Sequence, residues 1–231
     1  MKNALKYSFP LTIPIMAGYV FLGISFGILA TSKGLPLYYP VLMGIVIYGG
    51  SMQFAAVNLL LAAFNPIGAI LLTLMVHARH IFYGITMLAP FNQLKNGFRK
   101  VYCMFGLTDE TFSLLASLEV PEEQDRNWVY FLVTFLNQCY WVIGCGLGAV
   151  IGSNLTFNTE GIEFVLTALF VTIFVEQWLN ASSHRPAIIG LVGSAVCLVI
   201  FGGANFMIPA MIIILILFSL DYYKEVKQGH E

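Results

Sequence analysis

Between Lys33 and Lys95 the sequence carries a single charged side chain, Arg79. The stretch is otherwise apolar enough to supply several segments of about 20 residues, the length that one membrane-spanning helix needs. Across all 231 residues, 58% are hydrophobic and 10% are charged, whereas soluble domains carry about 25% charged residues. The sequence therefore predicts an all-α polytopic protein embedded in a lipid bilayer. The net charge of −1 argues against a nucleic-acid partner.

Seven segments have the length and apolarity expected of spanning helices. They are residues 9–31, 40–63, 66–89, 128–152, 161–180, 186–203 and 204–221. An eighth segment, 101–118, is apolar at both ends but has Asp109 and Glu110 at its centre. Adjacent carboxyls are costly in hydrocarbon, whereas irregular backbone is tolerated where it lines a cavity. We predict about seven transmembrane helices plus one broken or re-entrant segment, all within a single domain over residues 1–231.

The positions of the cations set the expected orientation, because cytoplasmic loops are enriched in Lys and Arg. If 101–118 does not cross and the N-terminus lies outside, most cations fall on the cytoplasmic side. These are Lys33, Lys95, Arg99, Lys100, Arg126, Arg185, Lys224 and Lys227. Lys2 and Lys6 violate the rule. We expect the N-terminus outside and the C-terminus inside.

Two parts of the sequence resemble each other. Gly23-x3-Gly27 in the first span matches Gly144-x3-Gly148 in the fourth, and Pro66 and Pro186 open later spans. This pattern predicts repeat halves 1–118 and 128–221, inverted relative to each other, as in many secondary transporters. The alternative is chance similarity, because glycine and proline are common in membrane helices.

Polar side chains within the apolar segments are candidate substrate ligands. Adjacent glycines at 49 and 50 weaken a helix but allow a backbone or a ligand to approach closely. Side-chain amides can hold the carboxylate or ammonium group of a zwitterion by hydrogen bonds. The candidate substrate-binding residues are Ser51, Gln53, Asn58 and Asn137. The alternative is that these residues only join helices together.

Arg79 needs a partner if it lies within the membrane. The acids available to it there are limited to Asp109, Glu110 and Glu176, and we expect pairing with one of the first two. The candidate gating or coupling residues are Arg79, His80, Asp109, Glu110 and Glu176. A purely structural ion pair, snorkelling of Arg79 to the interface and Thr108 as a helix N-cap are the alternatives.

Other chemistry finds little support in the sequence. His77 and His80 have helical spacing, but no further ligands complete a metal site. The four cysteines form no CxxC pair, and no Walker A, Rossmann or serine-elbow motif occurs. The sequence therefore predicts neither a cofactor nor an enzyme. A channel or permease for another small solute, an intramembrane enzyme using His77, His80 and Asp109, and a regulatory subunit are the alternatives to a transporter.

Four motifs occur in order along the chain: GGSMQFAAVNLL, ARHIFYG, LTDETFSLL and GCGLGAVIG. In these motifs and their spacing the chain resembles the AzlC family, the large subunit of branched-chain amino-acid exporters. Many members have Asn or Asp in place of His77. The resemblance implies a secondary transporter that moves valine, leucine, isoleucine or close analogues outward across the cell membrane. It also implies a small, very hydrophobic AzlD-like partner subunit.

Overall fold

The computed structural model describes residues 2–62, 66–77, 79–154 and 183–228, together with isolated positions between 161 and 181. Every regular element within these residues is an α-helix. The chain divides into two compact units, Met1–Thr167 and Ala168–Glu231. The predicted all-helical class is confirmed, and the repeat halves 1–118 and 128–221 stay a prediction.

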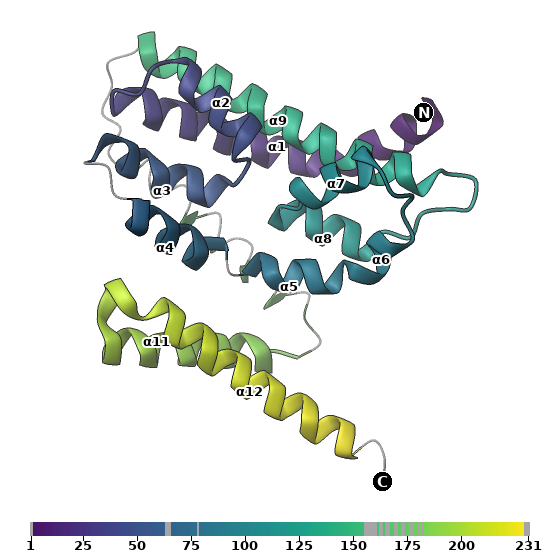
Figure 1. Cartoon of the computed structure of the whole chain (residues 1–231), viewed down its shortest axis with the longest axis vertical. Helices are drawn as coiled ribbons and strands as arrows, with labels where there is room; N and C mark the ends of the chain where they lie inside the picture. The colour runs from purple at the N-terminus through teal and green to yellow at the C-terminus, as the bar shows by residue number, and fades with distance from the viewer. Residues whose placement is uncertain are drawn as a thin grey trace. The chain divides into compact units, whose positions relative to one another are not determined.

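Helices α1 (Lys2–Ser32) and α9 (Arg126–Asn154) are the two longest helices of the first unit and lie side by side (Figure 1). Their glycines face each other: a Cβ on Gly23 would lie 2.9 Å from the backbone nitrogen of Cys145, and one on Gly144 would lie 2.8 Å from the Val20 carbonyl oxygen. The similar Gly-x3-Gly motifs thus allow close helix packing. Further along, Gly152 meets Ile28, so the two helices run in the same direction.

Helices α2 (Tyr38–Val46) and α3 (Gly50–Leu61) form a helical hairpin. Gln138 of α9 donates to the Ile45 carbonyl at 3.0 Å, and further along α9 Gly146 lies near Val41, so α2 runs antiparallel to α9. The chain then turns at Tyr48, whose φ is +45°, and α3 returns toward the end at which α2 begins (Figure 1). The prediction of one continuous span over 40–63 is therefore wrong.

The predicted span 66–89 is helical but broken. Helix α4 (Pro66–His77) is followed by α5 (Arg79–Thr86), and the two are bent by 49° relative to each other. The short helix α6 (Leu88–Asn92) extends this path to the start of α9, where Phe91 packs against Tyr130. Together α4, α5 and α6 run antiparallel to α9.

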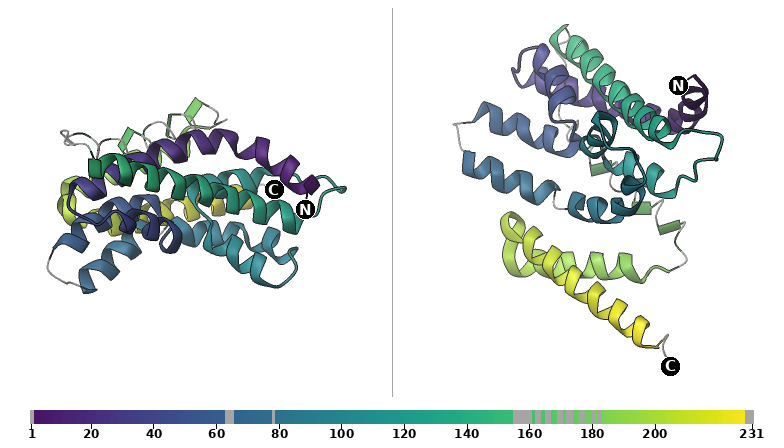
Figure 2. Two further views of the ribbon diagram at one scale, coloured as in Figure 1. Left: turned by 90° about the horizontal axis from the view of Figure 1, so that it is seen from above. Right: turned by 45° about the vertical axis from the view of Figure 1, so that its right-hand side comes forward.

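The predicted break within 101–118 is confirmed. Helix α7 (Phe98–Phe105) runs parallel to α9, and α8 (Asp109–Ser117) runs back antiparallel to it. Arg99 stacks on Trp128 near the start of α9, whereas Gly106, at the turn, lies against Thr134. The hairpin α7–α8 therefore enters the unit from the end opposite to α2–α3, as the views in Figure 2 also show.

The N-terminus and most of the basic residues of the first unit lie at the same end of this unit. Tyr7 donates to the Glu119 carbonyl at 3.4 Å, and Lys95 N donates to Asn127 Oδ1 at 2.7 Å. Lys2, Lys6, Lys95, Arg99, Lys100 and Arg126 all belong to this end. Lys33 follows α1 at the other end. The expected outside N-terminus depended on 40–63 crossing the membrane, and the returning hairpin removes that premise.

The second unit contains α11 (Arg185–Asn205) and α12 (Met207–Gln228), which pack against each other with Gly193 beside Ile214. They match the predicted spans 186–203 and 204–221, whereas the predicted span 161–180 falls mostly outside the described residues. Within the described residues, three helices are long and apolar enough to cross a membrane: α1, α9 and Arg185–Gly203. The bent pair α4–α5 gives a fourth when it counts as one span.

Candidate functional site

Three interruptions in the helices of the first unit meet at one place. They lie between α2 and α3, between α4 and α5, and between α7 and α8. Ser51 in the first turn of α3, Arg79 at the start of α5 and Asp109 at the start of α8 are joined by direct contacts. The N-termini of α3 and α8 therefore converge there, and each brings free backbone N–H groups and a partial positive charge.

The ion pair between Arg79 and Asp109 lies at this convergence. Arg79 Nη2 is 2.8 Å from Asp109 Oδ2 and donates to Ser51 Oγ at 3.3 Å. Tyr83, one turn after Arg79 on α5, donates to the other carboxylate oxygen of Asp109 at 2.8 Å. The pairing expected from the sequence is thus present. Because the two side chains keep 33% and 24% of their surface exposed, water screens part of the attraction.

The neighbouring carboxylate, Glu110, has a different partner. Tyr19 of α1 donates to Glu110 Oε2 at 2.7 Å, and its hydroxyl lies 2.6 Å from Thr108 Oγ1. Thr108 also caps α8, because its side chain accepts from the backbone nitrogen of Thr111. The N-cap at Thr108, one of the structural alternatives named above, is thus present. The two adjacent acids therefore tie α8 to two different helices, α5 and α1.

Two buried amides each use only one of their two polar atoms in a hydrogen bond. Gln53 Oε1 accepts from Trp141 Nε1 at 2.8 Å, and Asn137 Nδ2 donates to Thr111 Oγ1 at 3.0 Å. Both amide side chains are fully buried. The other atoms, Gln53 Nε2 and Asn137 Oδ1, have no hydrogen-bond partner among the residues that the structure describes. Asn137 and Trp141 are one turn apart on the same face of α9. Because Gln53 is bonded to Trp141, its spare donor lies about one helical turn along α9 from the spare acceptor of Asn137.

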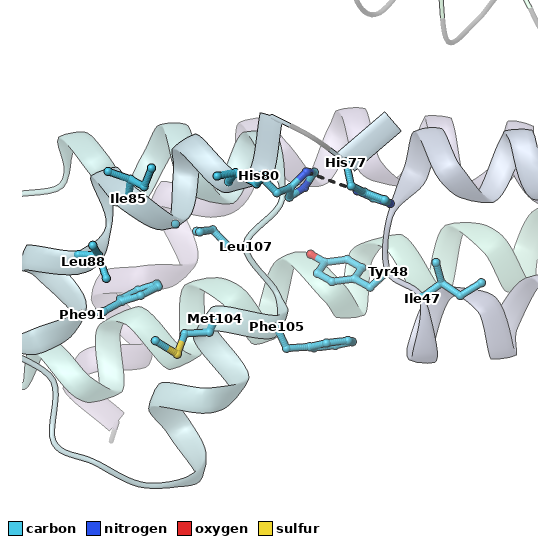
Figure 3. Close-up of a pocket in the computed structure, with 12 residues that line it drawn as sticks. Ile47, Tyr48, His77, His80, Ile85, Leu88, Phe91, Met104, Phe105 and Leu107 are labelled. Atoms are coloured by element: carbon cyan, nitrogen blue, oxygen red, sulfur yellow. Dashed lines mark hydrogen bonds between the residues drawn. The ribbon is translucent and has the colours of Figure 1, made fainter. Parts of the chain in front are cut away.

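His77 and His80 adjoin this network, since the ring centroids of His80 and Tyr83 are 5.2 Å apart. Their Nδ1 atoms are 3.4 Å apart, and both rings line a pocket of about 620 Å³ together with Tyr48 (Figure 3). Within the described part of the chain, no three His, Cys, Asp or Glu side chains are grouped as a metal site would need.

The structure brings together most of the residues proposed from the sequence. Ser51, Arg79 and Asp109 are in contact, and Glu110, Gln53 and Asn137 lie on the elements that converge there. Asn58 does not belong to this group, because it is an exposed residue further along α3. Glu176 lies outside the described residues.

Several partners in the site were not among the residues proposed from the sequence. They are Tyr19, Tyr48, Tyr83, Thr111 and Trp141. Tyr83 could have been found, since it follows Arg79 by four residues on one helix face. The other contacts join residues far apart in the sequence, and no local pattern predicts them.

The family model described as AzlC protein matches residues 14–155, which include every described member of the site. The chain belongs to the AzlC family. The Bacillus subtilis protein named branched-chain amino acid transport protein AzlC is 50% identical over 92% of this chain and 83% of its own. An uncharacterized membrane protein of Haemophilus influenzae is 41% identical over 97% of this chain and 91% of its own. The inner membrane protein YgaZ of Escherichia coli is 28% identical over 74% and 72%. No solved structure matches.

These similarities agree with the helices. Relatives that cover nearly the whole chain are membrane proteins, and the described helices include several that are long and apolar enough to cross a bilayer. This AzlC family member is therefore a multi-pass membrane protein, and its family indicates a transporter rather than an enzyme.

Proposed function

We propose that this protein is a secondary transporter that exports valine, leucine, isoleucine or close analogues across the cytoplasmic membrane. Support for the substrate class comes from the Bacillus relative, which is named for branched-chain amino-acid transport and is 50% identical. Outward direction and a small AzlD-like hydrophobic partner follow from the resemblance to two-subunit exporters.

The observation that carries the proposal is the pair of half-used buried amides. An amino acid presents a carboxylate, which accepts hydrogen bonds, and an ammonium group, which donates them. Gln53 Nε2 offers a buried donor, and Asn137 Oδ1 offers a buried acceptor. Leaving such groups unpaired costs about 1–3 kcal/mol each, and a bound zwitterion would remove that cost. Ser51 and the N-terminus of α3 supply further donors for the carboxylate.

The hairpins supply a route for alternating access. Discontinuous helices that meet near the middle of the membrane are a common arrangement in secondary transporters. Here α2–α3 and α7–α8 enter from opposite ends, and their turns meet at Tyr48 and Gly106. A Cβ added to Gly106 would lie 3.5 Å from Cε1 of the Tyr48 ring. Each hairpin would close the site toward one side of the membrane. Arg79, His80, Asp109 and Glu110 would join the moving parts and gate or couple transport.

We place the N-terminus in the cytoplasm. With both hairpins re-entrant, α1, α4–α5 and α9 cross in turn, and the end that carries Lys2, Lys6 and the basic residues between Lys95 and Arg126 becomes cytoplasmic. This orientation satisfies the positive-inside rule with Lys33 as the exception in the first unit. Three further crossings, predicted at 161–180, 186–203 and 204–221, would return the C-terminus to the cytoplasm.

Efflux from dipeptide-loaded cells tests the function. Cells that lack this protein should retain branched-chain amino acids several-fold longer than the parent strain, and cells that lack the small hydrophobic subunit should behave in the same way. Equal efflux from the parent and both deletion strains would refute the proposal. Saturable counterflow of labelled leucine in membrane vesicles is expected for a carrier, whereas flux without saturation would indicate a channel.

A further inference from the structure

A pocket beside α5 borders the ion-pair network, because His80 lines the pocket and packs against Tyr83. It is formed by the turn after α2, by α5 and α6, and by the end of α7 (Figure 3). Its volume of about 620 Å³ falls within the range of small-molecule sites, roughly 300–1,000 Å³. All of its walls belong to the first unit.

The pocket has one polar end and one apolar end. Tyr48, His77 and His80 bring the polar atoms, and Figure 3 shows the ring of Tyr48 projecting into the pocket opposite the two histidines. Tyr48 is 4% exposed. The apolar end is made by side chains such as Ile85, Leu88, Phe91, Met104 and Leu107. The arrangement suits a ligand with a polar head and a short aliphatic tail.

The polar end is continuous with the candidate binding site. A Cβ placed on Gly49 would lie 2.8 Å from His77 Cε1, so the histidine packs directly against the start of α3. Gly49 is the N-cap of α3 and provides no side-chain cap, and two residues later Ser51 accepts from Arg79. A carboxylate held at this helix terminus would therefore lie at the polar end of the pocket, and its side chain could extend toward the apolar end.

Gly84 lines the pocket and, because it has no side chain, leaves space in it. It lies within α5, where glycine is less favourable than alanine by about 1 kcal/mol. A Cβ added to Gly84 would meet no described atom within 4 Å, so no close backbone contact in the described residues requires glycine there. Any larger side chain at this position would take space from the pocket.

We propose that this pocket receives the branched aliphatic side chain of the transported amino acid, and that Gly84 sets the length of side chain that fits. The inference rests on the proposed transport function and names the part of the site that determines specificity. Since a methylene in an apolar pocket changes discrimination about 10- to 200-fold, a change of wall volume should alter the preference among aliphatic substrates.

The test compares leucine and valine efflux in cells whose chromosomal copy carries Gly84→Ala, Gly84→Leu or Met104→Ala. Chromosomal variants keep whatever partner subunit the cell supplies. We expect Gly84→Leu to lower the leucine-to-valine efflux ratio about 10-fold and Gly84→Ala to lower it less. Met104 is half-exposed, so Met104→Ala should fold normally and raise the ratio. The matched control is Gly18→Leu in α1, where an added Cβ also meets open space but no pocket.

Each outcome decides between the two hypotheses. An unchanged leucine-to-valine ratio in all pocket variants, with the parent protein active, would overturn the pocket assignment and leave the transport function standing. An equal fall in both fluxes, at normal protein abundance, would also overturn it. If the parent protein moves neither amino acid faster than the deletion strain, the transport function itself fails, and the pocket assignment fails with it.

Discussion

Arg79 and Asp109 form an ion pair, with Arg79 Nη2 2.8 Å from Asp109 Oδ2, at the point where α5 and α8 both begin. Asp109 is the first residue of α8, and Arg79 belongs to α5, which is bent by 49° relative to Pro66–Leu74. The pair therefore joins the bent crossing segment α4–α5 to the hairpin α7–α8. The contact from Arg79 to Ser51 adds the second hairpin, α2–α3, so one guanidinium connects all three broken elements.

Removing one partner of this pair should reduce both stability and transport. We expect Arg79→Gln or Asp109→Asn to lower the free energy of unfolding by about 1.5 kcal/mol, the low end for a charged hydrogen bond because both side chains are partly exposed. The charge swap Arg79→Asp with Asp109→Arg should recover part of that loss. Thermal unfolding in detergent measures the coupling, with Lys6→Gln as the control for an exposed cation. Additive losses without any rescue would show that the pair is not coupled.

The proposed role of Gln53 in binding can be separated from its role in packing. Gln53→Met removes the spare donor and leaves Trp141 Nε1 unpaired, so we expect a loss of about 1–3 kcal/mol in stability. Adding Trp141→Phe removes the second half of the bond and should restore much of the stability. Leucine efflux should stay low in both variants, because neither can donate to the substrate. Recovery of efflux together with stability would assign Gln53 a structural role alone.

The sequence predicted the Arg79 pairing because charges are so scarce in this chain. With no Asp or Glu before position 109, an intramembrane arginine had few acids to meet. The break in 101–118 was predictable for a similar reason, since Thr108, Asp109 and Glu110 form a helix start in the middle of an apolar segment. In both cases the prediction came from polar residues within an otherwise apolar segment.

No comparable pattern in the sequence predicted the hairpin α2–α3. Residues 40–63 are apolar on both sides of the turn, and hydropathy does not distinguish a helix that crosses from one that returns. The Gly49–Gly50 pair, which marks the turn, equally suits close helix packing. The matched Gly-x3-Gly motifs face each other across one helix pair, and the repeat that they suggested stays a prediction. Such relations depend on contacts between distant segments, which a single sequence does not contain.

The packing of α1 on α9 should be very sensitive to the size of residue 23. A Cβ on Gly23 would lie 2.9 Å from two backbone atoms of α9, and backbone cannot move aside as a flexible side chain can. We expect Gly23→Ala to lower the unfolding free energy by about 1–3 kcal/mol. Gly18→Ala, in the same helix but facing open space, should be neutral or slightly stabilising. Equal effects of the two substitutions on thermal unfolding would contradict the close contact.

The start of α9 should make stability depend on pH. Asp125 Oδ1 accepts from the backbone nitrogen of Asn127 at 2.9 Å and from that of Trp128 at 3.4 Å. Burial raises the pKa of Asp125, but hydrogen bonds from Asn127 and Trp128 outweigh it and lower the pKa below its usual value. A lowered pKa means that the carboxylate stabilises the fold above about pH 4 and that this contribution is lost as the pH falls through the folded-state value.

Asp125→Asn keeps an acceptor for the first turn of α9 but cannot titrate. We expect the melting temperature of the parent protein to fall more between pH 5 and pH 3 than that of the variant. Asp125→Ala should cost about 1 kcal/mol at neutral pH, as the loss of a helix N-cap does. Parallel pH profiles for the parent and Asp125→Asn would show that another group controls the acid transition.

The course of the first unit predicts which of its loops are reached from outside the cell. If α2–α3 returns to the side it enters from, the turn after α1 is external, and the turn between α6 and α7 is cytoplasmic. We expect Gly34→Cys to react with a membrane-impermeant maleimide in intact cells and Asn96→Cys to react only after permeabilisation. The four native cysteines, which lie within helices, are replaced by alanine in both variants.

An N-terminus outside the cell would give the reverse pattern. If 40–63 crossed the membrane and 101–118 did not, Gly34→Cys and Asn96→Cys would react alike, because two crossings would separate them. The labelling therefore tests the hairpin and the orientation together, and each wrong assignment gives its own result.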